Sequence, residues 1–454
     1  MKRQEIVYTI RRGVAVCLIM ALTLTGCSLP GKQQKPSYTP PESTQTQKQE
    51  QVGMSKEDAA YAALDYLQNM SVEEKVGQLF VVNLELLDDT QGSYYEHKKI
   101  TRQMKESLEK YHVGGVIFFS RNIARRKQTK KLVRRLQANA PIPLFIAVDE
   151  EGGDVARIGS NARMKTTTFP TMEEIGQTKD ADYVYNMAAT IGQEIGELGF
   201  NVDFAPVADV NTSELNKEIG SRSFGDDPEQ VSKMVDAYVK GLKSQNICST
   251  LKHFPGQGSS SGDTHQGSVD IDSSIARLRK VDFKPFRVGI ESGADFIMVS
   301  HISVSKVTES SEPASMSDLI MTTILREELG FDGLIITDAF DMASITDTYT
   351  AAEAAYGSFR AGADIVLMPQ NLEEAYQAIL EKVQDGTLEQ KRLDDSVVRI
   401  LRLKFEKGIL TLDDLEKAGT AEKASPAAVS TTMPSGKKKQ GQSKTDKKKN
   451  TNNP

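Results

Sequence analysis

The stretch Leu334-Ile335-Ile336-Thr337-Asp338 joins three large aliphatic residues in a row to a terminal carboxylate. A short apolar run of this kind is typical of a strand in a parallel sheet, which is buried on both faces. Seven similar runs occur elsewhere in the chain. They are Leu79–Leu84, Gly115–Ser120, Leu144–Asp149, Val202–Val207, Ile247–His253, Phe296–His301 and Ile365–Pro369. Counting Leu334–Asp338, we therefore expect eight buried parallel strands.

Amphipathic stretches with helical periodicity separate the predicted strands, for example Gln128–Asn139, Asp182–Gly199 and Gln230–Ser244. Eight strands that alternate with helices favour an α/β fold, the (β/α)8 TIM-type barrel, over an open sheet. A dinucleotide-binding fold is not expected, because no Gly-x-Gly-x-x-Gly follows a strand into a helix. The helix predicted over Leu393–Lys407 closes this single catalytic domain, and Gly408 caps it.

Residues 1–27 have the organisation of a bacterial lipoprotein signal peptide. Basic residues precede the apolar run Val14–Leu24, as in the n- and h-regions of a secretory signal. The run ends in Leu24-Thr25-Gly26-Cys27, which resembles a lipobox whose cysteine, Cys27, becomes the lipidated first residue. An uncleaved anchor helix is the alternative, but the run is shorter than the ~20 residues that span a membrane. Both interpretations place the body outside the cytoplasm, anchored to the membrane of the bacterial cell envelope.

The rest of the chain divides into three segments by composition. Residues 28–54 are rich in Gln, Ser, Thr and Pro, which predicts a disordered tether. Residues 55–417 form the predicted barrel, and residues 418–454 form a Lys-rich tail that we expect to be disordered. The chain has a formal net charge of −6 although the tail is basic, so the body is strongly acidic. An acidic body argues against a nucleic-acid-binding domain, whereas the tail is either simply solvated or attracted to anionic wall polymers.

Asp338 and the pair Asp263 and His265 are the candidate catalytic groups. Chemistry in a TIM-type barrel takes place where strands end and loops begin, and Asp338 ends a predicted strand. A carboxylate there can attack an anomeric carbon and form a glycosyl-enzyme; a helix N-cap or a structural ion pair is the alternative. Asp263 and His265 lie in the Gly- and Ser-rich loop 256–265, which we expect to be a mobile flap. The carboxylate can orient the imidazole as a general acid and base, although isolated Asp-x-His triplets are also common in solvated loops.

Polar residues at other strand ends are candidate sugar ligands. Lys252 and His253 end one predicted strand, and His301 ends another. Asp149 and Arg157 flank a turn, where an Asp can accept two hydroxyl groups and an Arg can reach across to the same sugar. Each of these residues could instead belong to a structural ion pair or to the core. We expect no metal and no cofactor, because no His-x3-His or Cys-x2-Cys spacing occurs.

Six motifs, taken together and in this order, resemble the signatures of glycoside hydrolase family 3. They are Gly114–Asn122, Val148–Gly153, Asn201–Val210, Ser221–Gly225, Lys252–Gly256 and Leu329–Asp338. The similarity extends from about Ser71 to Gly408. Asp263-Thr264-His265, which follows the fifth motif, resembles the β-N-acetylglucosaminidase branch of the family.

This resemblance implies a role for each candidate residue. Asp338 would be the nucleophile, His265 the general acid and base, and Asp263 its partner. The non-reducing sugar would be bound by Asp149, Arg157, Arg222, Lys252 and His253, with His301 at a further pocket position. Two-domain β-glucosidases of the family typically take their proton donor from a second domain. A single-barrel chain needs a donor on the barrel itself, which Asp263 and His265 would supply.

The function implied by the resemblance is that of a retaining exo-β-N-acetylglucosaminidase acting on peptidoglycan fragments (muropeptides) or chitin-type oligosaccharides. A β-glucosidase or β-xylosidase of the same family is one alternative, and an inactive sugar-binding lipoprotein is another. Three positions depart from the branch: Gln257 stands for His, Ser259-Ser260 for Asp-Thr, and Asp154 for Arg. The first two could change how the flap closes, and Asp154 places a negative charge near the expected sugar site.

Overall fold

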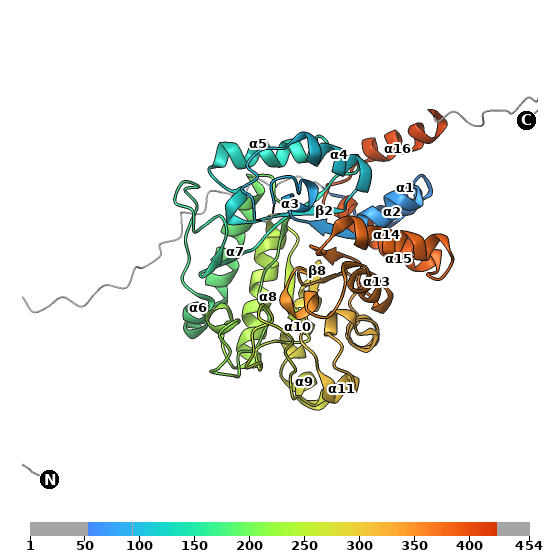
Figure 1. Cartoon of the computed structure of the whole chain (residues 1–454). Coiled ribbons are helices and arrows are strands. Elements are labelled where there is room, and N and C mark those ends of the chain that lie inside the picture. Colours follow the sequence, from blue (N-terminus) through green and yellow to red (C-terminus); the bar gives the residue numbers. More distant parts are fainter. Residues whose placement is uncertain (1–52, 93, 425–454) are drawn as a thin grey trace, which may run out of the picture. The chain divides into compact units, whose positions relative to one another are not determined.

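The computed structural model describes residues 53–92 and 94–424, with side chains to residue 420 (Figure 1). The predicted signal peptide with Cys27, almost all of the tether and most of the Lys-rich tail lie outside these residues. Within the described part, none of the helices combines the length and the apolar character needed to cross a membrane.

Eight parallel strands form the central layer of the described chain. They are β1 (Phe80–Val82), β2 (Gly115–Phe118), β3 (Phe145–Val148), β6 (Val202–Asp203), β7 (Thr250–Phe254), β8 (Phe296–Val299), β9 (Leu334–Thr337) and β10 (Val366–Leu367). One sheet has the order β10-β1-β2-β3-β6 and the other has the order β7-β8-β9. Parallel bridges from Val202 to Cys248 and from Ile336 to Ile365 join the two sheets at both edges. The strands therefore close into a barrel, which confirms the predicted fold class and all eight predicted strands.

Helices surround the barrel, and α8 packs between α7 and α10 (Figure 1). The longer helices are α1 (Lys56–Gln68), α4 (Arg102–Tyr111), α5 (Arg126–Gln137), α7 (Ala181–Gly196), α8 (Pro228–Ser244), α10 (Phe283–Ser292), α13 (Ala351–Ala361), α14 (Leu372–Gln384), α15 (Gln390–Glu406) and α16 (Leu412–Ala424). The shorter helices are α2 (Val72–Gln78), α3 (Leu84–Leu87), α6 (Met172–Thr178), α9 (Ile275–Lys280), α11 (Ser305–Thr308) and α12 (Ala343–Thr346). A π-helix covers Leu319–Glu328, and short 3-10 helices cover Ser120–Asn122, Gly220–Arg222 and Ala314–Met316. The helices predicted over Gln128–Asn139, Asp182–Gly199, Gln230–Ser244 and Leu393–Lys407 correspond to α5, α7, α8 and α15.

Side chains fill the barrel at the end where the strands begin. Phe145 opens β3 and Phe296 opens β8, and their ring centroids lie 5.3 Å apart in an edge-to-face contact. Lys404 of α15 is fully buried nearby, with Nζ 5.1 Å from the centroid of Phe145. Its Nζ donates a hydrogen bond to Oε1 of Gln78 at 2.7 Å. Because this end is packed, a site can open only where the strands terminate.

Two features of the structure differ from the predicted organisation. A short antiparallel hairpin, β4 (Glu150–Gly152) and β5 (Val155–Ala156), follows β3 directly. Its residues are too polar and too few to have the apolar pattern of a strand. The predicted barrel boundary at Lys417 also falls inside α16, because Leu415 and Ala418 pack against the core and extend the helix beyond that residue.

Candidate active site

A cavity of about 710 Å³ opens at the ends of the barrel strands. Its wall includes Ile117 of β2, Lys252 of β7, Met298 of β8 and Leu367 of β10, together with Asp338 just after β9. Seven predicted site residues line it: Asp149, Arg157, Arg222, Lys252, His253, His265 and Asp338. Asp263 and His301 are not among the lining residues. The predicted location of the site, at the carboxyl ends of the strands, coincides with this cavity.

Asp338 presents a carboxylate to the cavity immediately after β9. Its backbone N–H donates to the carbonyl of Val299 at 2.8 Å, and its Oδ1 accepts the N–H of Ala339 at 2.8 Å. The next helix, α12, is capped by Met342, so Asp338 is not an N-cap. Among residues 53–92 and 94–420, no ion pair involves this carboxylate. Neither structural alternative for Asp338 is therefore seen, and its side chain is left for chemistry.

Four charged residues form a network on the wall formed by β3, β4 and β7. Nζ of the buried Lys252 lies 3.0 Å from Oδ1 of Asp149 and 2.6 Å from Oε1 of Glu151. Arg222 binds Glu151 through two hydrogen bonds, of 2.9 and 2.7 Å. Burial alone would raise the pKa of Glu151, but the adjacent cations outweigh it and hold that pKa below its usual range. Arg157 joins the network more loosely, with a guanidinium nitrogen 3.8 Å from Oδ2 of Asp149.

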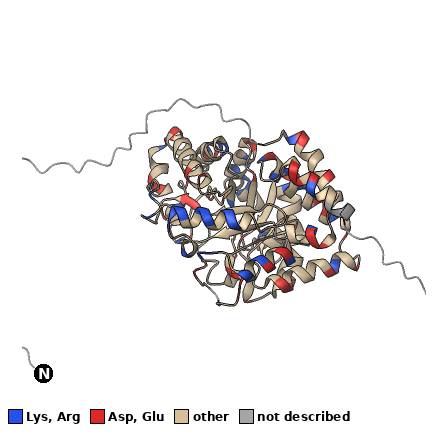
Figure 2. Cartoon of the chain, turned by 90° about the horizontal axis from the view of Figure 1, so that it is seen from above, with Lys and Arg blue, Asp and Glu red and all other residues tan. Residues whose placement is uncertain are grey.

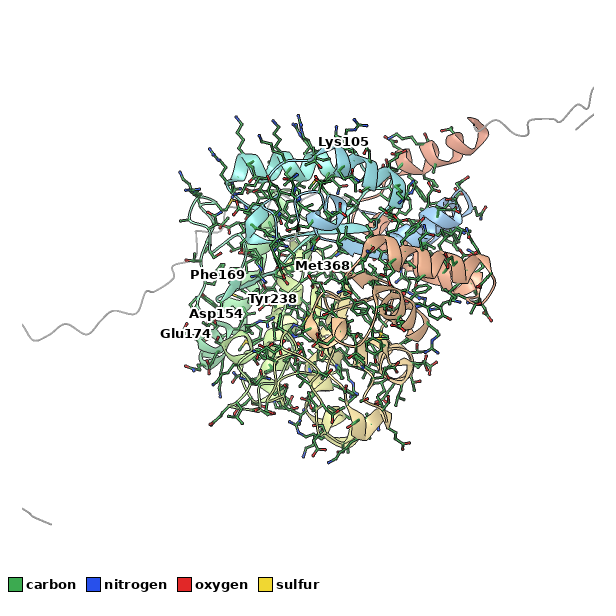
Figure 3. All side chains as sticks on the ribbon, in the orientation of Figure 1. Lys105, Asp154, Phe169, Glu174, Tyr238 and Met368 are labelled. Atoms are coloured by element: carbon green, nitrogen blue, oxygen red, sulfur yellow. The ribbon has the colours of Figure 1, made fainter. Side chains whose placement is uncertain are left out.

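The hairpin β4–β5 is held by hydrogen bonds to its backbone and to Glu150. The Tyr238 hydroxyl donates to the carbonyls of Glu150 and Glu151 at 3.1 and 3.2 Å. The Glu150 carboxylate accepts the N–H groups of Ile158 and Gly159, both at 2.7 Å, and burial raises its pKa to about 7. Tyr238 and Asp154 are both labelled in Figure 3. Asp154, in the turn of the hairpin, accepts a hydrogen bond from Ser221 and does not line the cavity. These contacts hold Asp149 and Glu151 in place beside Lys252.

His253 is oriented by a second buried carboxylate. Its Nδ1 lies 2.8 Å from Oδ2 of Asp209, which also accepts the backbone N–H of His253 at 3.2 Å. Oδ1 of Asp209 accepts the N–H of Gln257 at 2.6 Å. Because an ionised carboxylate only accepts, we assign the Nδ1 proton to His253, and its Nε2 is then left for the cavity.

The predicted flap, residues 256–265, is docked on the loop that follows β6. The N–H of Thr212 donates to the carbonyl of Gly258 at 3.0 Å, and Asn216 donates to the carbonyl of Gln257 at 2.8 Å. A Cβ atom on Gly258 would lie only 2.1 Å from the carbonyl oxygen of Val210, so a glycine is required there. The first half of the flap is therefore fixed by backbone contacts.

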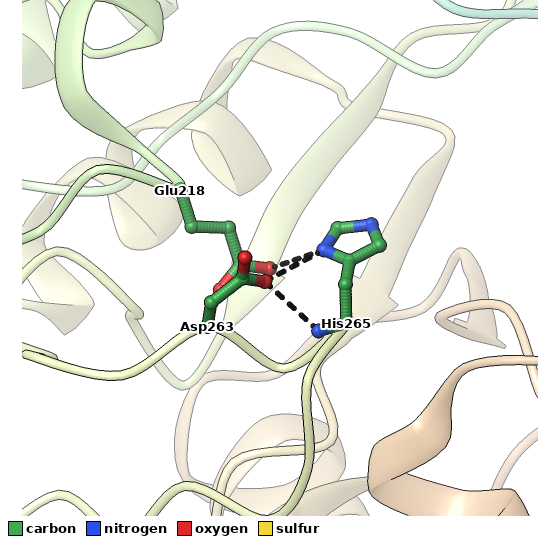
Figure 4. A group of neighbouring side chains, drawn as sticks. All are labelled: Glu218, Asp263 and His265. Carbon is green, nitrogen blue, oxygen red and sulfur yellow. Dashed lines mark hydrogen bonds and ion pairs between the residues drawn. The ribbon is translucent and has the colours of Figure 1, made fainter.

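His265 lies at the far end of the flap, where two carboxylates face the same ring nitrogen (Figure 4). Its Nδ1 is 2.9 Å from Oδ1 of Asp263 and 3.3 Å from Oε1 of Glu218. Asp263 is nearer, but the more buried Glu218 contributes most to raising the pKa of His265 to about 9. Burial would raise the pKa of Glu218, and hydrogen bonds from His265 and Thr264 lower it to about 2. With Nδ1 occupied, Nε2 is the ring atom left for proton transfer.

The same three side chains are the group in the described chain whose geometry could hold a metal ion. One donor atom from each of Glu218, Asp263 and His265 lies within 4.8 Å of the others. All three also take part in the hydrogen bonds described above, which account for their arrangement. The sequence motifs associated with metal ligands are absent from this segment.

His301 has a supporting position rather than the predicted place on the cavity wall. Its side chain is buried, with Nδ1 2.8 Å from the Ser315 hydroxyl and Nε2 3.0 Å from the carbonyl of Ala339. Its ring also packs on Phe340. Both ring nitrogens are thus used by the protein, so in this geometry His301 supports the segment after Asp338 instead of contacting a sugar directly.

Among the wall residues that were not predicted, Glu151 and Glu218 are the two that take part in the charged networks described above. Glu151 stands two positions after Asp149 in the motif Val148–Gly153, and its proximity to a strand end was a usable signal. Glu218 lies in a different loop from the flap, and no local spacing connects it with His265.

Comparison with known proteins places the chain in a family. The family model described as "Glycosyl hydrolase family 3 N terminal domain" matches residues 71–403. Beta-hexosaminidase A of Pseudoalteromonas piscicida is 37% identical over 330 residues, 66% of this chain and 55% of its own length. Beta-hexosaminidase LpqI of Mycobacterium tuberculosis is 33% identical over 345 residues, 74% of this chain and 83% of its own length.

A solved structure shows the same relationship in three dimensions. The family 3 β-N-acetylglucosaminidase of Paenibacillus sp. str. FPU-7 superimposes with a TM-score of 0.70 and 30% sequence identity. The match covers 77% of this chain and 68% of that structure. On the family match and the shared fold, the chain belongs to glycosyl hydrolase family 3.

Proposed function

We propose that this protein is a retaining exo-β-N-acetylglucosaminidase, which removes non-reducing terminal GlcNAc from peptidoglycan fragments or chitin-type oligosaccharides. The observation that carries the proposal is one cavity lined by both the unpaired carboxylate of Asp338 and the imidazole of His265. A nucleophile and a proton donor at one sugar site are what a retaining glycosidase requires. A protein that only binds sugar needs neither group.

The reaction would take place in two steps. In the first, the Asp338 carboxylate attacks the anomeric carbon while Nε2–H of His265 protonates the departing glycosidic oxygen, leaving a glycosyl-enzyme ester and a neutral imidazole. In the second, that imidazole takes a proton from water as the water attacks the anomeric carbon and releases Asp338. Two inversions at the same carbon give net retention.

The charged network on the wall of the same cavity suits the binding of sugar hydroxyl groups. Asp149 offers carboxylate acceptors, while Arg157, Lys252 and His253 offer donors around them. Arg222 would act mainly through Glu151, which occupies two of its nitrogens. The names of the relatives favour an N-acetylhexosamine over glucose or xylose as the sugar.

The proposed location is the outer side of a membrane, with the barrel anchored by a lipid on Cys27. The lipobox resemblance of Leu24–Cys27 supports this location. The Lys-rich tail at 418–454 would then be close to anionic wall polymers.

Hydrolysis assays test the proposed specificity. We expect turnover of nitrophenyl β-GlcNAc to exceed that of nitrophenyl β-glucoside and β-xyloside by a large margin. Mass spectrometry of products from purified muropeptides should show loss of one terminal GlcNAc. Preference for the glucoside would favour the β-glucosidase alternative, and activity on none of these substrates would favour the sugar-binding alternative.

A further inference from the structure

Glu218 connects the acid/base pair to a different part of the barrel. Its side chain is only 8% exposed. Its two carboxylate oxygens accept the Thr264 hydroxyl at 2.6 Å and the Thr264 backbone N–H at 3.0 Å. One of the same oxygens, Oε1, lies 3.3 Å from Nδ1 of His265. Glu218 thus contacts both the flap backbone and the catalytic ring.

The backbone around Glu218 is itself fixed. The Glu218 carbonyl accepts a hydrogen bond from Arg222 at 3.0 Å, and Arg222 is held by Glu151 in the sugar-binding network. The side chain of Asn216 accepts the N–H of Ile219 at 2.9 Å and donates to the carbonyl of Gln257. The Glu218 carboxylate therefore starts from an anchored loop on the cavity wall.

Asp263 and Glu218 constrain His265 in different ways. Asp263 belongs to the same loop as His265, so its hydrogen bond fixes the ring only relative to that loop. Glu218 belongs to another loop, so its contacts fix the end of the flap, and with it the ring, relative to the barrel. The position of a proton donor relative to the leaving oxygen must be accurate to within a fraction of an ångström. This accuracy requires the contact with Glu218 in addition to the contact with Asp263.

We propose that Glu218 is a positioning residue, which docks the end of the flap and holds His265 with Nε2 facing the cavity. This inference rests on the proposed function of His265 as acid and base. Glu218 itself transfers no proton and makes no bond to the sugar. Its loss should impair the step that needs the proton donor, while leaving sugar binding and attack by Asp338 intact.

The test compares Glu218→Gln with Glu214→Gln, an exposed glutamate of the same loop, because both substitutions make the same change in charge. On a glycoside with a poor leaving group, we expect Glu218→Gln to lower kcat/KM by about 10- to 100-fold, because a misplacement of about 1 Å in a reacting group can cost about that much. On a dinitrophenyl glycoside, whose leaving group needs no proton, the rate of glycosylation should change by less than about threefold. Glu214→Gln should resemble the unaltered protein on both. Equal losses on both substrates, or no loss on either, would overturn the proposal.

A spectroscopic readout separates this inference from the proposed activity. In nitrogen NMR of the full chain labelled at histidine, we expect a slowly exchanging Nδ1–H signal of His265, assigned with His265→Ala. That signal should broaden or vanish in Glu218→Gln and persist in Glu214→Gln. An unchanged signal in Glu218→Gln would overturn the positioning role whatever the enzyme hydrolyses. Absence of GlcNAc hydrolysis by the unaltered protein would overturn the proposed function instead.

The outer surface of α5 carries a cluster of basic side chains. From Lys110 to Val148 the chain contains nine Lys and Arg residues and no Asp or Glu. Six of these cations are exposed on or beside α5 and form its basic face: Arg125, Lys127, Lys130, Lys131, Arg134 and Arg135. Within the described residues none of the six takes part in an ion pair. Figure 2 shows α5 as a mostly blue helix, and Figure 3 shows Lys105 of α4 on the same side.

The basic face is rigid because the rest of α5 is held by the barrel. Thr129, Leu132, Val133 and Leu136 are buried against the core. The charged side chains must therefore point outward, and the apolar ones cannot insert into a membrane. A partner can therefore be held at this surface only by electrostatic attraction, as the headgroups of anionic lipids would be.

We infer that the basic face of α5 rests on an anionic lipid bilayer and orients the barrel there. Charge complementarity supports this occupant, because the six cations form no ion pair within the described part of the chain and stand on an otherwise acidic body. The proposed anchor supports it too, since Gly53 is 26 positions after Cys27, and a chain of that length reaches at most roughly 90 Å and would confine the barrel to the membrane. Weak headgroup contacts then become effective without tight binding of their own.

Co-sedimentation of the unlipidated mature chain, residues 28–454, with phosphatidylglycerol vesicles at low ionic strength tests this surface, because weak contacts with headgroups are then least screened. Failure of the unaltered chain to bind under these conditions would overturn the inference. Charge reversal of Lys127, Lys130, Lys131 and Arg134 to Glu should weaken binding to phosphatidylglycerol vesicles by more than about tenfold. The matched control reverses the charge of four exposed lysines on other elements, Lys179, Lys233, Lys243 and Lys280. Its binding to the vesicles should weaken much less. Equal losses would show a simple effect of net charge and overturn the inference. The inference would also be overturned if charge reversal on α5 abolished binding to a soluble polyphosphate but left binding to the vesicles intact.

Discussion

Nδ1 of His265 lies 2.9 Å from Oδ1 of Asp263, and the same oxygen accepts the backbone N–H of His265, also at 2.9 Å. One carboxylate thus holds both the ring and the main chain of the residue. The side chain of His265 is 63% exposed, so local hydrogen bonds rather than burial give it a defined direction. An exposed imidazole held in this way can meet a glycosidic oxygen that enters from solvent.

Removal of the imidazole should slow the hydrolysis of substrates with poor leaving groups far more than that of substrates with good leaving groups. His265→Ala should lower turnover of natural disaccharides by about 10²- to 10⁴-fold, while glycosylation by a dinitrophenyl glycoside is largely spared. Azide should restore turnover of the good substrate and yield a β-glycosyl azide. Asp263→Asn should cause a milder loss in the same direction, because it loosens the ring without deleting it. Equal losses on good and poor leaving groups would point to a defect in folding or binding.

The pH dependence of kcat/KM should report the proton on His265. Its pKa is raised to about 9 by Glu218 and Asp263, so the free enzyme keeps the required proton below that pH and loses it as pH rises through it. We expect the alkaline limb for poor leaving groups near pH 9, and we expect it to move to lower pH in Asp263→Asn. A wild-type limb near the ordinary histidine value of about 6.5 would contradict this electrostatic account.

The strands of the barrel were predictable because burial on both faces leaves a visible apolar run in the sequence. The hairpin β4–β5 leaves no such run, since its two short strands depend on tertiary contacts such as those from Tyr238. Asp338 could be located from its position at a strand end alone. Glu218 could not, because its partner Thr264 is 46 residues away in the chain and only the folded loops bring the two together.

The difference between His253 and His301 illustrates the same limit. Both stand at the end of an apolar run, His253 within β7 and His301 just after β8, and both were predicted as sugar-binding residues. Asp209 uses only one ring nitrogen of His253, whereas Ser315 and Ala339 use both ring nitrogens of His301. Such neighbours come from distant segments, so the sequence pattern around each histidine does not distinguish a cavity wall from a buried support.

Lys404 should make stability depend on pH. Burial lowers its pKa from 10.5 to about 7, so the unfolded chain binds the proton more tightly between these values. Stability contributed by this group is present above pH 10.5 and is lost as pH falls to about 7. Lys404→Met removes this penalty but leaves Oε1 of Gln78 without its donor, at a cost of about 1–3 kcal/mol.

We therefore expect the Tm of Lys404→Met relative to the unaltered protein to rise as pH is lowered from about 9.5 to about 6, a window set by the two pKa values of Lys404. Calorimetry at several pH values would measure this difference. A difference in Tm that is constant across the range, or that falls toward acid pH, would show that Lys404 keeps its proton in the folded state.

Substitution of Cys27 tests the proposed location. Cys27→Ser should prevent lipidation, leaving the protein unprocessed or releasing it from the membrane fraction. Cell fractionation and intact-mass measurement of the mature chain would follow both outcomes. A Ser variant that is cleaved normally and stays in the membrane fraction would rule out the lipobox interpretation.

The covalent intermediate on Asp338 is the central claim, and trapping it is the most direct test. Incubation with a 5-fluoro GlcNAc glycosyl fluoride should inactivate the protein and add one sugar to the peptide that contains Asp338, identified by mass spectrometry of a digest. Asp338→Asn should fold normally, take up no label and lose activity by several orders of magnitude. Labelling at another carboxylate, or an Asp338→Asn variant that keeps most of its turnover, would contradict the account.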